Sequence, residues 1–217
     1  MHGELEPPIV GFDLDMTLTD PRQGALAAWS ALEAELCAGI HPQWVVDKLG
    51  PPLEDVLSRW LPAAVIEKAA WRYRALFEEL GISASKAMPG AKAAVEAVHG
   101  FGGKVIVVTA KWERHARAEL DAVGISTDAV IGWRYGIAKG ETLREYGAHF
   151  YVGDHPADIA AAKFAQVFGI MVATGPASFD ELTAAGADEV LKSLWEFPDR
   201  FEMRWRDLCR SGRSMPR

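Results

Sequence analysis

Short hydrophobic runs, separated by longer segments with helical periodicity, form the main pattern of the chain. Such uninterrupted runs are typical of parallel strands that are buried on both faces of a sheet. They lie at Ile9–Phe12, Val105–Val108, Phe150–Val152 and Val167–Val172, with a weaker run at Ala129–Ile131. Each run predicts one strand of a parallel sheet.

The segments between these runs predict helices. Two apolar stripes with helical spacing are Ala91, Val95 and Val98, and Ala116, Leu120 and Val123. The stretch SFDE, from Ser178 to Glu181, is typical of a capping box at a helix start. Pro156 suits the first position of a helix. Alternating strands and helices predict the α/β class, with a Rossmann-like parallel sheet core and helices on both faces.

The stretch from Pro21 to about Lys86 breaks this alternation, because it contains no convincing strand. Its apolar stripes are helical: Ala25, Trp29, Leu32 and Leu36, then Val65, Ala69, Tyr73, Leu76 and Leu80. We therefore expect an all-helical cap at 21–86, inserted into a discontinuous core made of 1–20 and 87–217. An insert directly after the first strand would lie over that strand's carboxyl end, where open α/β sheets bind ligands.

Composition narrows the class of protein. The chain has 217 residues, of which 49% are hydrophobic and 24% charged, with a formal net charge of −7. An acidic chain argues against nucleic acid or an anionic membrane as partner. Cys37 and Cys209 fit no metal or disulfide spacing and indicate free thiols in a reducing compartment. The polar start of the chain is no signal peptide, so we expect a cytoplasmic protein. The arginine-rich segment 200–217 is expected to be a frayed helix followed by a disordered end.

Asp13 and Asp15 follow the first hydrophobic run at once, in GFDLDMTLTD. Residues two apart in an extended segment project to the same side, so both carboxylates are expected to face one pocket. Desolvated carboxylates that lie close together are costly. A bound metal dication and a phosphoryl group would stabilise them.

Three more polar signals follow later runs. Thr109 closes VIVVTAK, and a hydroxyl at a strand-to-helix turn suits a phosphate oxygen. Lys139 is a cation just before an expected helix, and VGDHPADI supplies Asp154 and Asp158 near the start of another. Each signal is weak alone. Together, on successive strand ends of one sheet, they predict a phosphate and metal site.

These residues resemble the motifs of the haloacid dehalogenase superfamily of phosphatases. The matching positions are Asp13, Asp15 and Thr17 of DxDxT, the strand ending in Thr109, Lys139, and Asp154 and Asp158 of GDxxxD. An insert between the first two motifs matches the subgroup with a helical cap. LGPPLEDVL, MPGAKAAVEAV and VVTAK are most similar to phosphoglycolate phosphatases.

The resemblance implies a Mg²⁺-dependent phosphatase that acts on a small phosphorylated metabolite such as 2-phosphoglycolate. Asp13 would be the nucleophile that forms an aspartyl phosphate, and Asp15 the general acid and then the general base. The implied metal ligands are Asp13, the Asp15 backbone carbonyl and Asp154, with Asp158 orienting a metal-bound water or Lys139. The implied phosphate-binding groups are Thr17, Thr109, Lys139 and the backbone N–H groups around Met16 and Ala110. Dehalogenation is not expected, because dehalogenases lack the second aspartate.

Met16 departs from the family pattern, which usually has glycine there. Only the N–H group is needed at this position, and a methionine with φ > 0 would be strained. We therefore expect Met16 to have φ < 0 and to aim its side chain toward the cap, where it would trim the leaving-group pocket.

The cap loop GPPL, with Gly50, Pro52 and Leu53, has two interpretations. It is a substrate-specificity loop whose N–H donors near Leu53 meet a carboxylate, or a helix–helix turn set by its two prolines. The cap tryptophans are expected to pack in a core, and His155 to fill a loop rather than bind a metal.

Three alternative functions stay open at this point. They are a phosphomutase, a pyrophosphatase on the same site, and a catalytically silent binding protein of the same fold. The sequence leaves the oligomeric state open between monomer and homodimer.

Overall fold

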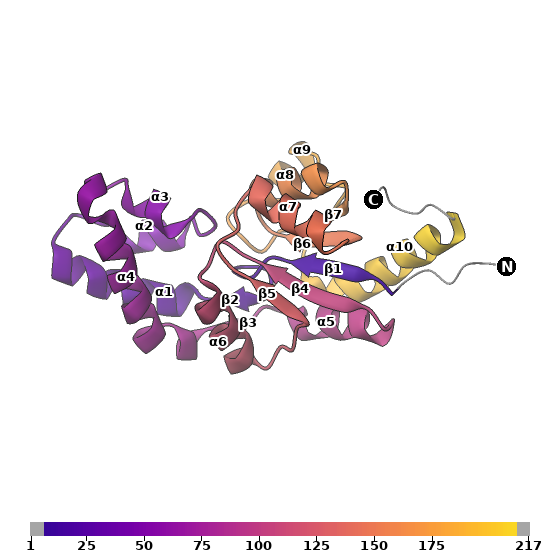
Figure 1. Cartoon of the computed structure of the whole chain (residues 1–217), viewed down its shortest axis with the longest axis horizontal. Helices are drawn as coiled ribbons and strands as arrows, with labels where there is room; N and C mark the ends of the chain where they lie inside the picture. Colours follow the sequence, from indigo (N-terminus) through magenta and orange to yellow (C-terminus); the bar gives the residue numbers. More distant parts are fainter. Residues whose placement is uncertain (1–6, 212–217) are drawn as a thin grey trace.

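A six-stranded parallel sheet forms the centre of the computed structural model, which describes residues 7–211 (Figure 1). Its strands are β1 (Ile9–Phe12), β4 (Lys104–Val108), β5 (Ala129–Ile131), β6 (Phe150–Gly153), β7 (Phe168–Val172) and β8 (Glu189–Leu191). They are ordered β5-β4-β1-β6-β7-β8, and every neighbouring pair is parallel. The predicted α/β class is confirmed, and each hydrophobic run forms a strand.

Helices cover both faces of this sheet. One face carries α5 (Ala91–Gly100), α6 (Glu113–Val123) and α10 (Phe197–Ser211), and the other carries α7 (Ile137–Glu145) and α8 (Pro156–Ala165) (Figure 1). Side chains along a strand alternate between the faces. In β4, Val105 and Val107 therefore join one core cluster, whereas Ile106 and Val108 join the other. Two-sided burial explains why the strands are continuously hydrophobic.

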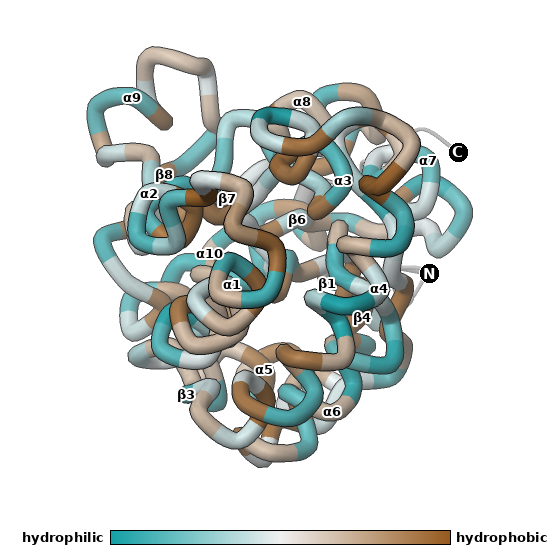
Figure 2. The backbone as a smooth tube through the Cα atoms, turned by 90° about the vertical axis from the view of Figure 1, so that its left-hand side faces the viewer, coloured by the Kyte–Doolittle hydropathy of each residue, from teal (hydrophilic) through white to brown (hydrophobic). Residues whose placement is uncertain are grey.

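The insert has a hydrophobic core of its own. Its helices are α1 (Arg22–Leu36), α2 (Pro42–Val46), α3 (Leu53–Leu57) and α4 (Ala63–Leu80), followed by a short 3-10 turn, η1 (Ile82–Ala84). Trp29, Leu32 and Leu76 are buried in a cluster that contains only insert residues. Trp71 lies outside this core and is 48% exposed. Figure 2 looks from the insert side and shows that α1 and α4 carry both hydrophobic and hydrophilic residues.

Two short pairings escaped the sequence prediction. The insert joins the core through β2 (Thr19–Asp20) and β3 (Lys86–Ala87), which pair antiparallel. Two-residue strands are too short to leave a periodic signal. Strand β8 was missed for a related reason, because it has three residues and begins with a glutamate.

The C-terminal segment differs from its prediction. Residues up to Ser211 continue a 15-residue helix, α10, rather than a frayed one, because Phe201 and Trp205 are buried against the sheet. Residues 212–217 lie outside the described part of the chain. The capping box of α9 (Phe179–Ala184) and the start of α8 at Pro156 are confirmed. Within residues 7–211, no helix is both long and apolar enough to cross a bilayer.

Candidate active site

The strand order brings the predicted motifs together. β1 lies at the centre of the sheet between β4 and β6, and its partners on both sides are parallel. Asp13 follows β1, Thr109 follows β4, and Asp154 follows β6. Because the carboxyl ends of parallel strands meet at one edge, these three residues share that edge.

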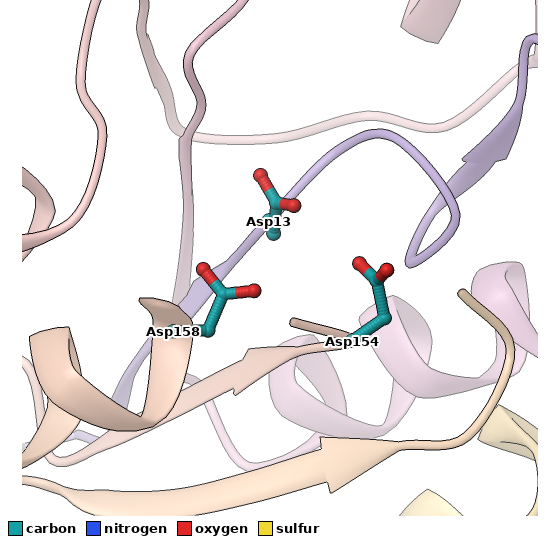
Figure 3. Close-up of side chains that lie close together, drawn as sticks. All are labelled: Asp13, Asp154 and Asp158. Atoms are coloured by element: carbon teal, nitrogen blue, oxygen red, sulfur yellow. The ribbon is translucent and has the colours of Figure 1, made fainter. Parts of the chain in front are cut away.

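Three buried carboxylates form the acidic cluster of the site: Asp13, Asp154 and Asp158. One oxygen from each lies within 4.8 Å of the others, and none of the three residues is more than 7% exposed. Figure 3 shows them coming from the end of β1, the loop after β6 and the first turn of α8. Mg²⁺ prefers carboxylate oxygens, so the set suits a hard divalent cation.

Lys139 is the cation inside this cluster. It lies in the first turn of α7 rather than before the helix, and its Nζ is 2.8 Å from Asp13 Oδ1 and 2.7 Å from Asp158 Oδ1. Gly140 lets α7 approach α8, since a Cβ atom there would lie 2.7 Å from the carbonyl oxygen of Ala161. The close packing of these helices brings Lys139 to the sheet edge.

The electrostatics of the acidic cluster favour a further positive charge. Burial, opposed by Lys139 and reinforced by Asp158, raises the pKa of Asp13 to about 7. Burial and the charges of Asp13 and Asp158 also raise the pKa of Asp154 well above its usual range. Three carboxylates face one ammonium group, so full ionisation leaves a buried negative surplus. A dication would compensate that surplus, and the donor set therefore fits the predicted metal.

Neighbouring hydrogen bonds hold the acidic cluster in place. Thr17, predicted among the phosphate-binding residues, donates its hydroxyl to Asp154 Oδ1 at 2.9 Å. Asp158 accepts from Tyr151 Oη at 3.1 Å, in addition to Lys139. His155 is not merely a loop filler: it caps α8, where its Nδ1 accepts from a backbone N–H while Asp158 accepts from the His155 N–H. Tyr151 lay hidden in an apolar strand run and gave no separate signal.

Thr109 and Ala110 lie at the end of β4 as predicted. The Thr109 side chain is buried, and its Oγ1 accepts from the Lys111 N–H at 3.2 Å. Ala110 lines a cavity between the core and the insert. Thr109 therefore lies at the acidic edge of the sheet, and Ala110 lies next to the insert.

A second charged group, which we call the Lys111 cluster, consists of Asp15, Lys111, Glu119 and Ser85. Lys111 Nζ is 2.6 Å from Asp15 Oδ1 and also bonds Glu119, and Ser85 Oγ donates to Glu119 Oε1 at 2.5 Å. Glu119 is fully buried. The sequence contained one signal for this cluster, since Glu119 sits beside Leu120 within the apolar stripe of α6.

The two aspartates of the first motif therefore take different partners. Asp13 meets Lys139, whereas Asp15 meets Lys111 and lines the cavity below the insert. The charge of Asp15 is nevertheless close enough to contribute, after burial and Asp158, to the raised pKa of Asp13. Different surroundings are what two carboxylates with different chemical roles require.

Met16 contradicts its prediction in two ways. Its φ is +62°, not negative, and its side chain is buried in the core cluster under α5, α6 and α10 rather than aimed at the cap. The backbone conformation is fixed on both sides, because the Met16 N–H donates to Thr19 O and its carbonyl accepts from Thr174 Oγ1. Burial of the side chain offsets a left-handed strain of about 1–2 kcal/mol. The Met16 N–H is occupied within the loop, which does not support its expected role as a phosphate donor.

The cavity between core and insert has a volume of about 100 Å³. Gly50 and Leu53 line it, whereas Pro52 immediately precedes α3. The other lining residues are Asp15, Pro21, Ala25, Trp29, Val45, Lys48, Leu49, Pro51, Val56, Tyr73, Arg74, Phe77, Ala110, Lys111, Trp112 and His115. The GPPL loop is thus both a turn into a helix and part of a cavity wall.

Comparison with known proteins places the chain in a family. The family model of haloacid dehalogenase-like hydrolases matches residues 10–163, which is more than half of the chain. The chain belongs to this family. A curated relative, "Probable phosphatase IndB" of Dickeya dadantii (strain 3937), is 27% identical over 210 residues, covering 87% of this chain and 91% of the relative.

Solved structures of this hydrolase family share the fold. A haloacid dehalogenase-like hydrolase from Streptococcus pneumoniae has a TM-score of 0.79 at 20% identity, covering 89% of this chain and 98% of its own. A structure described as a predicted phosphoglycolate phosphatase from Haemophilus somnus 129pt has a TM-score of 0.73 at 22% identity, with coverages of 89% and 97%. These similarities include the inserted helices, since nearly the whole of each chain is matched.

Proposed function

We propose that this hydrolase is a Mg²⁺-dependent phosphatase that releases a small alcohol from its phosphomonoester through an aspartyl phosphate. The observation that carries the proposal is the acidic cluster of Asp13, Asp154 and Asp158, buried around Lys139 at the carboxyl edge of the sheet. Family membership and the similarity to a phosphatase support it.

In the first half-reaction, Asp13 attacks phosphorus and the bond from phosphorus to the ester oxygen breaks. Asp15 gives its proton to the departing oxygen, so the product leaves as a neutral alcohol. In the second half-reaction, Asp15 takes a proton from water, which attacks the aspartyl phosphate. Phosphate leaves and the Asp13 carboxylate is restored. Lys111 fixes the orientation of Asp15 through its contact with Oδ1.

The residues that would hold Mg²⁺ are Asp13, the backbone carbonyl of Asp15, and Asp154, whose orientation Thr17 fixes. Asp158 orients Lys139 and supports the cluster from α8. When bound, the ion neutralises charge between the nucleophile and the phosphoryl group.

Lys139 and Thr109 are the side chains proposed to stabilise the phosphoryl oxygens, together with the N–H group of Ala110. Asp13 and Asp158, opposed by burial, raise the pKa of Lys139 well above its usual range, so its charge is retained at neutral pH. A fixed cation beside the nucleophile stabilises the charge that develops on the transferring group. For the insert, we propose that Gly50 and Leu53 in the cavity wall, with Pro52 fixing the turn, take part in substrate selection.

The test is hydrolysis of p-nitrophenyl phosphate with Mg²⁺ by the wild type and by Asp13→Asn. We expect activity to fall by roughly 10⁴-fold or more, because a nucleophile is lost. Asp121→Asn, which changes an exposed carboxylate of α6, serves as the matched control. Acid quenching with ³²P-labelled substrate should trap label on the wild type but not on Asp13→Asn. Equal phosphate release by Asp13→Asn and wild type would overturn the proposal.

A further inference from the structure

The geometry points to a substrate whose leaving alcohol carries a flat, uncharged ring with a hydrogen-bonding group, rather than a small carboxylate such as glycolate. This inference rests on the proposed function, in which Asp15 faces the leaving oxygen. The ring would lie in the cavity between core and insert, and His115 would bind its polar group.

The position of the cavity assigns it to the leaving group. Asp15, Ala110 and Lys111 form its core side, and the carboxylates of the acidic cluster are not among its lining residues. In the proposed reaction the phosphoryl group binds at Asp13, and the leaving oxygen departs on the side of Asp15. A group that extends from that oxygen therefore enters this cavity.

Aromatic rings line part of the cavity wall: Trp29, Tyr73, Phe77 and Trp112, with the imidazole of His115. Trp29 and Tyr73 have ring centroids 4.4 Å apart, and Trp112 and His115 4.9 Å apart. Aromatic pairs in offset or edge contact contribute beyond the area they bury. The volume of about 100 Å³ is of the same order as an apolar cavity of about 150 Å³ that holds benzene.

His115 supplies a polar ring atom beside the aromatic side chains of the wall. The residue is 3% exposed, and within residues 7–211 its Nε2 has no hydrogen-bond partner. The carboxylate of Glu78 is 3.8 Å away, beyond hydrogen-bond distance. Burial and the charge of Lys111 lower the pKa of His115 to about 4, so the ring is neutral at physiological pH. An unpaired buried nitrogen costs about 1–3 kcal/mol. A polar group on the ligand would remove that cost once the ring of His115 turns its Nε2 into the cavity that the residue lines.

The cations of the cavity are poorly placed to recognise a carboxylate. Arg74 pairs with Glu54 Oε1 at 2.6 Å, and its guanidinium lies over the rings of Trp71 and Trp133. Lys111 is already bonded to Asp15 and Glu119. Lys48 is the remaining cation of the lining and is exposed. Among the cations of the cavity, a glycolate carboxylate would thus depend on Lys48, which allows the two substrate classes to be separated.

The first experiment compares kcat/KM for benzyl phosphate, the three pyridylmethyl phosphate isomers and 2-phosphoglycolate. We expect benzyl phosphate to exceed 2-phosphoglycolate by at least tenfold, and at least one pyridylmethyl isomer to exceed benzyl phosphate. Preference for 2-phosphoglycolate, with a tenfold rise of its KM in Lys48→Met, would overturn the inference and leave the proposed phosphatase intact. If no pyridylmethyl isomer has a higher kcat/KM than benzyl phosphate, the role of His115 is overturned.

Variants test the cavity itself. Val56→Phe narrows the cavity and should lower the ratio of kcat/KM for benzyl phosphate to that for 2-phosphoglycolate at least tenfold. Val65→Phe, on the exposed side of α4, is the matched control. His115→Phe keeps a ring but removes Nε2, and should abolish the preference for the favoured pyridylmethyl isomer. Unchanged ratios in both cavity variants would place the leaving group elsewhere.

Binding without turnover separates this inference from the proposed function. Calorimetry with Asp13→Asn and Mg²⁺ compares benzylphosphonate with phosphonoacetate, neither of which is a phosphate ester. We expect benzylphosphonate to bind at least tenfold more tightly, and Val56→Phe to remove the difference. Tighter binding of phosphonoacetate than of benzylphosphonate would overturn the inference that the leaving group carries a ring, whatever the activity of the wild type.

Discussion

Lys139 and Lys111 are both buried lysines that bridge two carboxylates, yet their surroundings differ. Lys139 bridges Asp13 and Asp158 at 2.8 and 2.7 Å, with Asp154 close by. Lys111 bridges Asp15 and Glu119, and a serine of the insert connection completes that chain. Three carboxylates lie around the first lysine and two bond the second, so the negative surplus is larger around Lys139, whereas the Lys111 cluster forms a hydrogen-bonded chain to Ser85. The first arrangement suits a cation, and the second fixes the side chain of Asp15.

The division of labour follows from where each lysine is anchored. Lys139 and its carboxylates all belong to the core, at the edge of one sheet. The Lys111 cluster instead joins the core helix α6 to Ser85, which lies between the insert and β3. Asp15 is therefore oriented by groups that span both parts of the molecule. We infer that the position of the insert and the orientation of Asp15 are connected.

The largest expected effect is the fall in kcat caused by Lys111→Met, which tests the Lys111 cluster. Asp15 loses the contact that orients it, and misplacement by about 1 Å costs roughly 10²-fold in rate. Proton donation matters most for poor leaving groups. The fall in kcat should therefore be larger for an alkyl phosphate than for p-nitrophenyl phosphate. Lys92→Met, at an exposed position of α5, is the control. Equal losses on both substrates would show that Lys111 does not act through Asp15.

The Lys139 site could be predicted from sequence for a physical reason. Each of its side chains follows a strong hydrophobic run or begins a helix, and the parallel sheet then brings the strand ends together. The Lys111 cluster could not be predicted in the same way. It depends on how α6 faces the connection at Ser85. The signal for this packing in the sequence is the position of Glu119 within the apolar stripe of α6, where it is buried.

Met16 and the cavity show two further limits of sequence-based prediction. A positive φ at a methionine runs against local preference, and burial of the side chain together with the hydrogen bonds to Thr19 and from Thr174 explains it. The cavity depends on contacts between insert and core, such as Phe77 against His115. The helical stripes predicted the insert helices but not the surface they present to the core.

Metal addition tests the surplus charge around Lys139, with an intermediate expected effect. In the metal-free protein the pKa of Asp13 is raised from 3.8 to about 7, chiefly by burial. Between these two pH values the folded state keeps the Asp13 proton that the unfolded state releases. The free energy of unfolding of the metal-free protein therefore falls as pH rises from about 4 to 7. Mg²⁺ binds the ionised carboxylates, so we expect its stabilisation to be larger at pH 8 than at pH 5, about 2.7 kcal/mol at 100 times Kd.

Thermal unfolding with and without Mg²⁺ measures this difference. Asp154→Asn should be more stable than the metal-free wild type at pH 8, since it removes a carboxyl group whose ionisation is made costly by burial, and it should lose most of the gain from Mg²⁺. Asp121→Asn, exposed on α6, should behave as the wild type. The same Mg²⁺ stabilisation at pH 5 and pH 8 would contradict a site made of these carboxylates.

Ser85→Ala tests the far end of the Lys111 cluster, with the smallest expected effect. Glu119 Oε1 would lose its 2.5 Å bond in a fully buried position, which costs about 1–2 kcal/mol. In a chain of this size each kcal/mol lowers the melting temperature by about 2–4 °C. Ser58→Ala, an exposed serine bonded to a backbone carbonyl in the insert, is the control and should change stability by less than about 0.5 kcal/mol.

The activity of Ser85→Ala then decides how far the orientation of Asp15 depends on the insert. Lys111 keeps both of its carboxylate partners in this variant, so we expect kcat to fall less than about threefold, far below the loss in Lys111→Met. A loss comparable with that of Lys111→Met, again larger for an alkyl than an aryl phosphate, would mean that Ser85 fixes Asp15 as strictly as the lysine does. The insert would then control the general acid itself and not only the space beside it.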